Sequence, residues 1–427
     1  GAFRWAESIH PAAYGNIGVE ELARLDLRVT PMKDGKILVT GGSVCVATTS
    51  NLSSICTPGD SDCKYCDEDG QRKLRSSALL FDPLAIDPEK PSHNGWFKWG
   101  WATKPRSRHT VTTFPASVSP GAKTCAKQNT EMVYLLGGHG KNLQETAELI
   151  QYAPKCDEIF IPWPMVDLDT SAIEVIKPQG IDWSGHTATL LPEENLTSDK
   201  ATILVVGRIQ SSDKCEAFLV NPAIGTSGKW EGPLSPELSF PCQGHSAEVI
   251  GQKGKEMIAI VGGEIEKGKP LDQVLLFDPR EKKFSSTVSH MRAPRSFATT
   301  GVLKSGDLIV AGGLLSQDTA NGMTVLRGRR DVEQFVFESR TSKSLPDMKC
   351  ARLHHTMTKL SPPTEASSAE QFLVVGGTGD DLEPSCTALG NPGTSSEVLY
   401  LNDSCGTHAD CSPDYDCVKP NCLPRGK

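Results

Sequence analysis

A short apolar run that ends in a pair of glycines recurs along this chain, and it constrains the possible folds more than any other feature. The copies are ILVTGG at 37–42, VYLLGG at 133–138, ILVVGR at 203–208, IAIVGG at 258–263, LIVAGG at 308–313 and FLVVGG at 372–377. Neighbouring copies lie about 50 to 95 residues apart, and such self-similarity is typical of a repeat protein. The sequence therefore predicts six repeated units.

Each unit contains the same series of short β-segments. A segment such as HTVTTF at 109–114 precedes the glycines, an apolar run such as QVLLFDP at 273–279 follows them, and a fourth segment often carries an aromatic residue such as Trp230. Helical periodicity is almost absent, and Pro-containing exits continue neither a helix nor a central strand. Because radial repetition of four-stranded sheets hides most sheet edges, we expect an all-β fold of this kind. The glycines would allow close backbone approach and a turn with positive φ.

These residues together resemble the kelch repeat, which has a glycine pair after the second strand, Tyr or Phe in the third strand and Trp in the fourth. The form is similar to the kelch propellers of the galactose oxidase family and of many secreted bacterial proteins. The resemblance covers residues 23–404 and implies a six-bladed kelch-type β-propeller. The third unit departs from the pattern at Arg208, and the fifth unit lacks the fourth-strand Trp.

The two ends of the chain are expected to lie outside the six repeats. The sixth unit shows three of its four strands, so we expect residues 1–22 to supply a linker and a closing strand that contains Trp5. Such a strand would remove the last open sheet edge. Residues 405–427 form a cysteine-rich tail that resembles modules of bacterial surface proteins, and a segment this short needs disulfides as staples. Zinc binding is the alternative, but the tail lacks C-x2-C pairs.

The fourteen cysteines favour an oxidising compartment, because their number is even and many lie in polar loops. Three sequons, at Asn51, Asn195 and Asn402, also fit secretion. The chain begins at Gly1, without a methionine or a signal-peptide-like segment, so we expect a mature or excised product that is secreted or on the cell surface. We expect seven local disulfides, with the connectivity open inside each group of four. The groups are Cys45, Cys56, Cys63 and Cys66; Cys125 and Cys156; Cys215 and Cys242; Cys350 and Cys386; and Cys405, Cys411, Cys417 and Cys422.

Charge and motifs argue against several functions. The net charge of −8 offers no basic field for nucleic acid, and no apolar run approaches the roughly 18 to 20 residues of a membrane span. The segment GEIEKGKP at 263–270 is close to a phosphate-binding loop, but Pro270 stands where that motif needs Ser or Thr. G-x-S-x-G and H-E-x-x-H motifs are absent, and the tyrosines show no copper-binding arrangement of the galactose oxidase type. We therefore expect neither a cofactor nor a metal.

The remaining functional signal is a set of basic residues. In the expected fold, the loops between second and third strands share one face with the links between blades, and this face receives many Arg and His residues. Guanidinium groups recognise carboxylates through paired hydrogen bonds, so acidic glycans or acidic protein segments are the expected ligands. The alternative is structural, because an Arg that opens a first strand can tie neighbouring blades together. The candidate ligand-binding residues are Arg106, Arg108, Arg208, Arg295 and Arg352.

We expect a secreted or cell-surface propeller that acts as a scaffold and binds a protein or a glycan, as part of a larger extracellular assembly. We do not expect it to be an enzyme. The alternative is a sugar-acid epimerase or a related carbohydrate-active enzyme, an expectation that rests on fold analogy. A carboxylate base beside a buried Arg at the axis would favour the enzyme, whereas a wet mouth lined only by Arg and His would favour the binding module.

Overall fold

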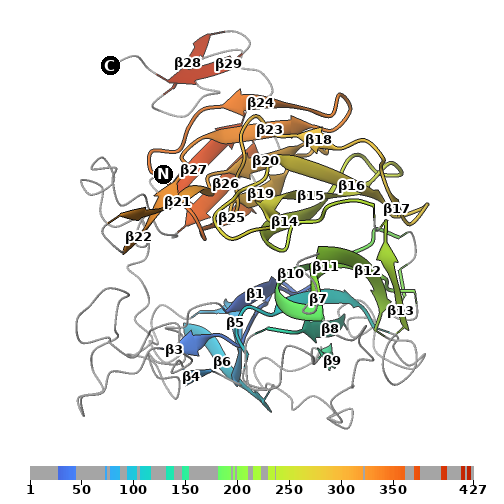
Figure 1. Ribbon diagram of the computed structural model, residues 1–427. Helices are drawn as coiled ribbons and strands as arrows, with labels where there is room; N and C mark the ends of the chain where they lie inside the picture. The colour runs from blue at the N-terminus through green and yellow to red at the C-terminus, as the bar shows by residue number, and fades with distance from the viewer. Residues whose placement is uncertain are drawn as a thin grey trace. The chain divides into compact units, whose positions relative to one another are not determined.

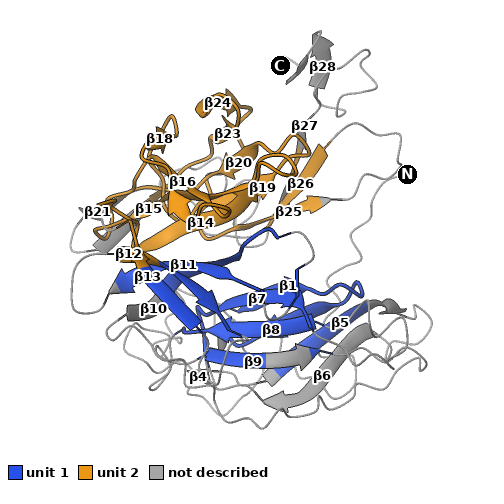
Figure 2. Cartoon of the chain, turned by 90° about the vertical axis from the view of Figure 1, so that its right-hand side faces the viewer, with its two compact units in different colours: residues 1–212, 218–232 blue, residues 213–217, 233–427 orange. Residues whose placement is uncertain are grey.

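The structure of the 427-residue chain is a computed structural model. It describes residues 27–44, 73–74, 77–86, 94–102, 106–116, 131–138, 147–152, 181–193, 196–197, 200–209, 215–222, 229–235, 237–320, 323–360, 370–375, 396–401, 415–418 and 421–424. The chain divides into two compact units, which are described one at a time (Figure 2). The first comprises residues 1–212 and 218–232, and the second comprises residues 213–217 and 233–427.

Every regular element in the described residues is a β-strand, so the expected all-β class is confirmed (Figure 1). No helix in these residues is long and apolar enough to cross a membrane. The strands β1 to β13 form three successive sheets and one small two-stranded sheet. They are β1 (Arg28–Pro31), β2 (Ile37–Thr40), β5 (Ser77–Ile86) and β6 (Asn94–Ala102); β7 (Thr110–Pro115), β8 (Glu131–Leu136) and β9 (Ala147–Tyr152); β10 (Ile181–Leu190), β11 (Ile203–Ile209), β12 (Cys215–Asn221) and β13 (Lys229–Leu234); with the two-stranded sheet of β3 (Ser43–Val44) and β4 (Lys73–Leu74).

The strands from β14 onward form three more sheets and two hairpins. They are β14 (Gln243–Ile250), β15 (Met257–Glu264), β16 (Gln273–Asp278) and β17 (Lys283–Phe284), with β18 (Ser289–His290) also on β16; β19 (Thr299–Val302), β20 (Leu308–Ala311), β23 (Val332–Val336) and β24 (Thr341–Leu345); and β25 (Thr356–Leu360), β26 (Glu370–Val375) and β27 (Ser396–Leu401). The hairpins are β21 (Leu314–Ala320) with β22 (Met323–Gly328), and β28 (Tyr415–Val418) with β29 (Asn421–Pro424).

In the described residues, six antiparallel sheets of three or more strands follow one another along the chain, and the second strand of each contains the apolar part of one repeated run. Within each unit, the first strands of successive sheets are neighbours: β1, β7 and β10 in the first unit, and β14, β19 and β25 in the second. The expected closing strand and linker, residues 1–22, lie outside the described residues.

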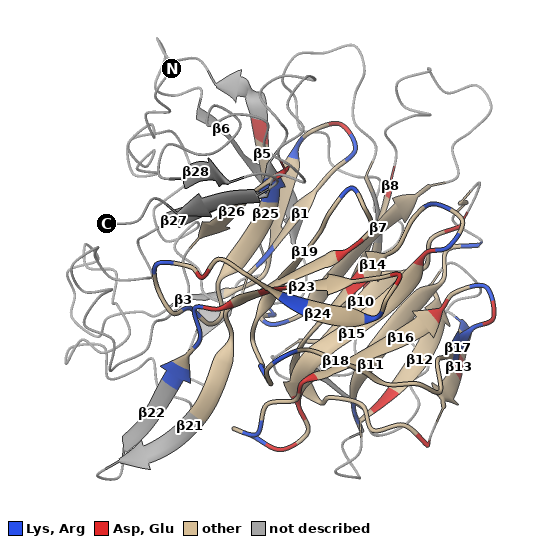
Figure 3. Ribbon diagram, turned by 90° about the horizontal axis from the view of Figure 1, so that it is seen from above, with Lys and Arg blue, Asp and Glu red and all other residues tan. Residues whose placement is uncertain are grey.

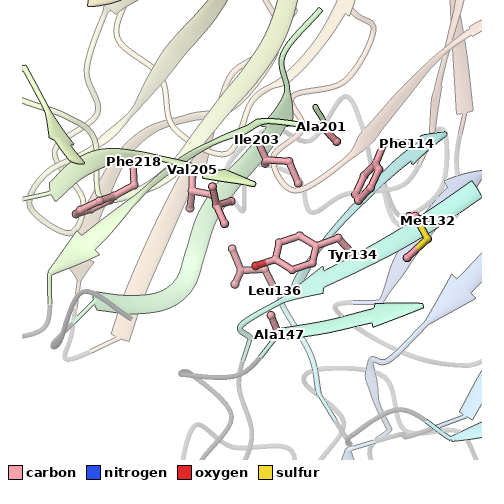
Figure 4. Close-up of a cluster of buried hydrophobic side chains, with 10 residues drawn as sticks. Phe114, Met132, Tyr134, Leu136, Ala147, Ala201, Ile203, Val205 and Phe218 are labelled. Atoms are coloured by element: carbon pink, nitrogen blue, oxygen red, sulfur yellow. The ribbon is translucent and has the colours of Figure 1, made fainter. Parts of the chain in front are cut away.

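The second strands are apolar along their whole length because both of their faces are covered. Every residue of β8 is buried. Its side chains Met132, Tyr134 and Leu136 belong to a cluster shared with β10 to β12, which Figure 4 shows, while Val133 and Leu135 join a different cluster with β2 and β5. At about 25 cal/mol per Å² of apolar surface removed from water, this double burial is the main favourable contribution to packing between sheets.

The glycine pairs lie at or just beyond the ends of β2, β8, β15 and β20, where the backbones of other segments approach them. At Gly312, with φ of 61°, a Cβ atom would lie 2.5 Å from the carbonyl oxygen of Arg352, which precedes the next sheet. At Gly313, with φ of 103°, a Cβ atom would lie 2.8 Å from the carbonyl oxygen of Ser296, which precedes the first strand of the glycine's own sheet. The amide of Gly313 also donates to the Arg352 carbonyl at 2.8 Å. The predicted reasons for the glycines, close approach and positive φ, are both confirmed.

Alanine at the first glycine of a pair should therefore destabilise the protein more than alanine in an exposed turn. A Cβ atom on Gly262 would lie 2.3 Å from the Arg295 carbonyl oxygen, whereas at Gly254 no atom lies within 4 Å, and both glycines have positive φ. We expect Gly254→Ala to cost about 1 kcal/mol, from backbone strain, and Gly262→Ala to cost about 3 kcal/mol or more. Urea unfolding of both variants measures the difference, and equal losses would show that the close contact is unimportant.

Candidate functional site

Five four-residue segments that precede a first strand or lie within its beginning share one backbone feature, and we call them links. They are residues 106–109, 183–186, 242–245, 295–298 and 352–355. The third residue of every link has a positive φ, between 53° and 77°. These third residues are Arg108, Gly185, Gly244, Phe297 and His354. A positive φ is uncommon for any residue other than glycine and costs roughly 1–2 kcal/mol, so the three larger residues are held there by their surroundings.

The first residue of three links is an arginine that is completely or almost completely buried. Arg295 donates from Nη1 to the Gly312 carbonyl oxygen at 2.9 Å, and its Nη2 contacts the carboxylates of Asp331, at 2.7 Å, and Glu333. Arg106 repeats this arrangement with the Gly137 carbonyl at 2.9 Å and Glu148 at 3.1 Å. Each guanidinium therefore fixes the end of a second strand and the start of a third strand in its own sheet.

The acidic partners of these arginines occupy one register position. Glu148 lies opposite Leu135, and Glu333 lies opposite Val310. Leu135 and Val310 each stand two positions before the first glycine of their pair. Glu397 takes the same position opposite Val374, in the sheet that Arg352 leads into. The sequence analysis missed these acids. They could have been found, because a Glu as second residue of the third strand accompanies an Arg in the link in all three of these repeats.

The fourth residue of four links is a buried histidine: His109, His186, His245 and His355. The ring of His109 lies over Gly41, where a Cβ atom would come within 2.6 Å of its Cε1, and the ring of His355 lies over Gly312 in the same way, at 2.8 Å. His109 Nε2 is 2.8 Å from the Thr40 hydroxyl. These histidines pack between neighbouring sheets.

The burial of these rings has a consequence for their ionisation. Burial, followed by the positive charges of Arg106 and Arg28 and the nearby His186, holds the pKa of His109 well below its usual range. Burial and the neighbours Arg352 and His354 lower the pKa of His355 to about 4, although a backbone hydrogen bond at Ala311 opposes the shift. At neutral pH the rings of His109 and His355 are therefore uncharged.

In the second unit, the third link residues form a continuous row, which we call the tip row: Gly244, Phe297 and His354. The Phe297 amide donates to the Gly244 carbonyl at 2.7 Å, and the His354 amide donates to the Phe297 carbonyl at 3.2 Å. The rings of Phe297 and His354 stack with centroids 4.3 Å apart and planes inclined by 39°. His354 is exposed and Phe297 is half-buried, so this stacked pair presents an aromatic surface to solvent.

The β21–β22 hairpin begins and ends beside the tip row. Leu314 pairs with Ser296 in an isolated β-bridge, and Arg329 pairs in the same way with Arg352. Lys and Arg outnumber acids around this hairpin base, and Figure 3 shows basic residues where β22 joins the sheets. The cations are Arg292, Arg295, Arg327, Arg329, Arg330, Lys349 and Arg352, against the acids Asp318, Asp331, Glu333 and Asp347. In a chain with a net charge of −8, this is a local excess of positive charge.

The exposed members of this set are the ones that can meet a ligand. Arg327 and Arg330 are exposed, and the Arg330 side chain, which is 52% accessible, lies 3.4 Å from Asp347. Arg329 is held 2.7 Å from Asp331, whose pKa is lowered by Arg329 and Arg295 even though burial opposes this shift. Charge, aromatic surface and backbone carbonyls are thus combined in one region of the second unit.

The predicted ligand-binding arginines divide into two groups. Arg106, Arg295 and Arg352 are buried, and the contacts of Arg106 and Arg295 support the structural alternative of arginines that tie backbone segments together. Arg108 is exposed and Arg208 is half-buried, so ligand binding stays a prediction for these two. Arg208 replaces a glycine because β10 and β11 continue to pair there, with Asp182 opposite Arg208, after a bulge between Asp182 and Thr187.

The structure confirms one predicted cysteine pair, and the other pairs stay predictions. Cys215 and Cys242 form a disulfide with a Cα–Cα distance of 5.1 Å, and Cys350 is disulfide-bonded. Cys417 and Cys422 lie directly opposite each other on β28 and β29. The remaining predicted cysteines lie outside the described residues: Cys45, Cys56, Cys63, Cys66, Cys125, Cys156, Cys386, Cys405 and Cys411. Within the described residues, no group of three or more His, Cys, Asp or Glu could hold a metal ion.

Known proteins give little further information about this site. No family model matches the chain, and no curated protein matches it. A solved structure, that of YjhT, is 14% identical over 89% of this chain and 97% of its own, with a TM-score of 0.47. A likeness of this size carries no argument about activity, so function must be argued from the residues.

The free energy of unfolding should fall as the pH is lowered from about 6.5 to about 4. His355 has a folded-state pKa of about 4 and an ordinary value of 6.5, so acid protonates the unfolded chain first and draws the equilibrium toward it. The contribution of neutral His355 to the free energy of unfolding is fully present above pH 6.5, and about 3 kcal/mol of it is lost near pH 4. We expect His355→Asn to flatten this dependence in urea unfolding, whereas His290→Asn, which removes an exposed histidine, should not. Identical pH dependence in the wild type and His355→Asn would contradict the assignment.

Proposed function

We propose that this chain is a six-bladed kelch-type propeller that works as an extracytoplasmic binding module for carboxylate-bearing ligands. The six consecutive antiparallel sheets and the neighbouring first strands within each unit support the propeller. The Cys215–Cys242 disulfide supports an oxidising location, outside the cytoplasm. The partner is a protein or an acidic glycan, and the module is a component of a surface assembly.

The observation that carries the binding proposal is the cationic hairpin base beside the stacked Phe297–His354 pair. Aromatic rings offer a rigid apolar surface to the C–H face of a sugar or to a side chain, at a low cost in conformational entropy. Guanidinium groups beside them can take a carboxylate through paired hydrogen bonds. Arg327 and Arg330 are exposed to solvent, whereas Arg295 is buried and its Nη atoms contact carbonyl and carboxylate groups of its own sheet.

The enzymatic alternative has one observation in its favour. Glu248, on the first strand β14, is half-buried and accepts a hydrogen bond from the Thr300 hydroxyl at 2.9 Å. Burial raises its pKa, and the Thr300 hydrogen bond only partly opposes the shift. A carboxyl group with a raised pKa suits acid–base chemistry on a sugar acid. Its partner in the described structure is a hydroxyl rather than a buried arginine, so the binding module remains the better supported function.

Neutralising exposed arginines at the hairpin base should weaken binding of acidic ligands without loss of stability. We expect the double variant Arg327→Gln/Arg330→Gln to bind an oligogalacturonate and a glutamate-rich peptide about tenfold or more weakly than the wild type, because each lost charged hydrogen bond contributes roughly 1.5–3 kcal/mol. Isothermal titration at low and high salt measures the effect, and binding by the wild type should weaken with salt.

Lys253→Gln provides the control, because it removes an exposed positive charge from the β14–β15 turn and should leave both affinities unchanged. Phe297→Ala should also reduce binding, which separates stacking from charge. If the double variant binds both ligands as well as the wild type does, the hairpin base is not the ligand site. Turnover of a sugar acid that is lost in Glu248→Gln would instead favour the enzyme.

A further inference from the structure

The β21–β22 hairpin is an insertion between two adjacent strands, β20 and β23, of one sheet. Its strands pair from Leu314 opposite Gly328 to Ala320 opposite Met323, with one irregularity between Leu314 and Ser316. Figure 1 shows it extending away from the sheets of its unit. At its base, the link residues Ser296 and Arg352 pair with its two sides. The hairpin is therefore anchored firmly where it leaves the sheets.

Beyond this base, the hairpin forms a sheet of only two strands within the described residues. Two-stranded ribbons are marginally stable in water and present a row of N–H and C=O groups along each edge, ready to pair with another strand. Proteins usually protect such edges with Lys or Pro, and the sequence LLSQDTANGMTVLRG at 314–328 contains neither. The hairpin thus lacks two of the usual devices against strand addition.

The chain connection at the end of the hairpin indicates which residues present their backbone groups outward. Ala320 and Met323 are opposite each other and are separated by the two residues Asn321 and Gly322. In hairpins with two-residue connections, the flanking pair is hydrogen-bonded and the pairs alternate from there. Thr324 and Leu326 then direct their N–H and C=O groups away from β21, along the outer edge of β22.

The charge around the base favours the β22 edge over the β21 edge. Arg327 lies within β22, and Arg329 and Arg330 follow it, whereas β21 carries the acidic residue Asp318. At the base of the hairpin both sides already pair with link residues, Leu314 with Ser296 and Arg329 with Arg352, so backbone pairing there does not distinguish the two edges. The arginines do distinguish them, because a strand laid along β22 would bring its side chains close to Arg327.

We propose that the outer edge of β22 takes an extended acidic segment of a partner protein as an added strand. The backbone of the segment pairs with Thr324 and Leu326, and its carboxylates meet the arginines at the hairpin base. Strand addition obtains its affinity from main-chain hydrogen bonds and its specificity from side chains. This inference rests on the proposed function, because it uses the same arginines, and it selects an extended polypeptide as the carboxylate-bearing ligand.

The test uses a probe of about ten residues that alternates glutamate and threonine, a length suited to the strands of the hairpin. A matched peptide with alternate N-methyl groups keeps every charge but cannot pair along an edge. We expect the first peptide to bind the full chain and the N-methylated peptide to bind about tenfold or more weakly. Hydrogen exchange should show that the peptide protects the amides of Thr324 and Leu326.

Variants of the protein test the same edge. Thr324→Pro removes the outward N–H from β22 and should weaken peptide binding about tenfold or more, whereas Thr324→Val should leave it within about twofold. Thr319→Pro makes the same change on the edge of β21 and should have little effect. Thermal unfolding should be the same in all three, because each change lies on a two-stranded hairpin inserted between β20 and β23.

The outcomes separate this inference from the proposed function. If an oligogalacturonate binds through Arg327 and Arg330 but neither peptide binds, or if both peptides bind equally, strand addition is wrong and the carboxylate site stands. If no acidic ligand binds, both proposals fail. If the chain forms dimers that Thr324→Pro abolishes, the edge takes a second copy of the chain rather than a partner, which overturns the inference.

Discussion

The backbone contact between a glycine pair and the link of the following sheet is the interaction on which the rest of the structure depends. The second glycine donates its amide to a link carbonyl at Gly42, Gly263 and Gly313, with N···O distances between 2.7 and 2.9 Å. The first glycine of the pair must lack a Cβ atom, which would collide with the link carbonyl, and the third link residue must adopt a positive φ. Beside this contact, the first link residue is buried at Arg106, Arg295 and Arg352, and the third link residue is exposed at Arg108 and His354.

This constraint also divides the basic residues by function. An arginine at the first link position is drawn into the protein, where carbonyl and carboxylate groups satisfy it, as at Arg106 and Arg295. A residue at the third position is displayed, as at Arg108 and His354. Two arginines that are only one residue apart, Arg106 and Arg108, therefore have opposite environments. The residues that remain for recognition are the displayed ones and those at the hairpin base.

The sequence was sufficient to predict the sheets, because their signals are local. An apolar run that ends in glycine can be recognised from its own residues, and each of the six runs overlaps a strand of the structure, although the third ends in Gly207 and Arg208. The links were harder to predict. The pattern located Arg295 and Arg352 but could not show whether they face inward, because this depends on Glu333 and on a carbonyl from Gly312, residues distant in the sequence. The pairing of Cys215 with Cys242 was predictable because they are only 27 residues apart and were expected to form a local pair within the third repeat.

The first link position is filled differently from sheet to sheet, and this gives the links different chemical weaknesses. Arg295 contacts the carboxylates of Asp331 and Glu333, which strong acid neutralises. Cys242 takes the same link position but is held by a disulfide to Cys215, which is indifferent to salt and acid and is cut by a reductant. Acid and reductant therefore act on different links of the chain.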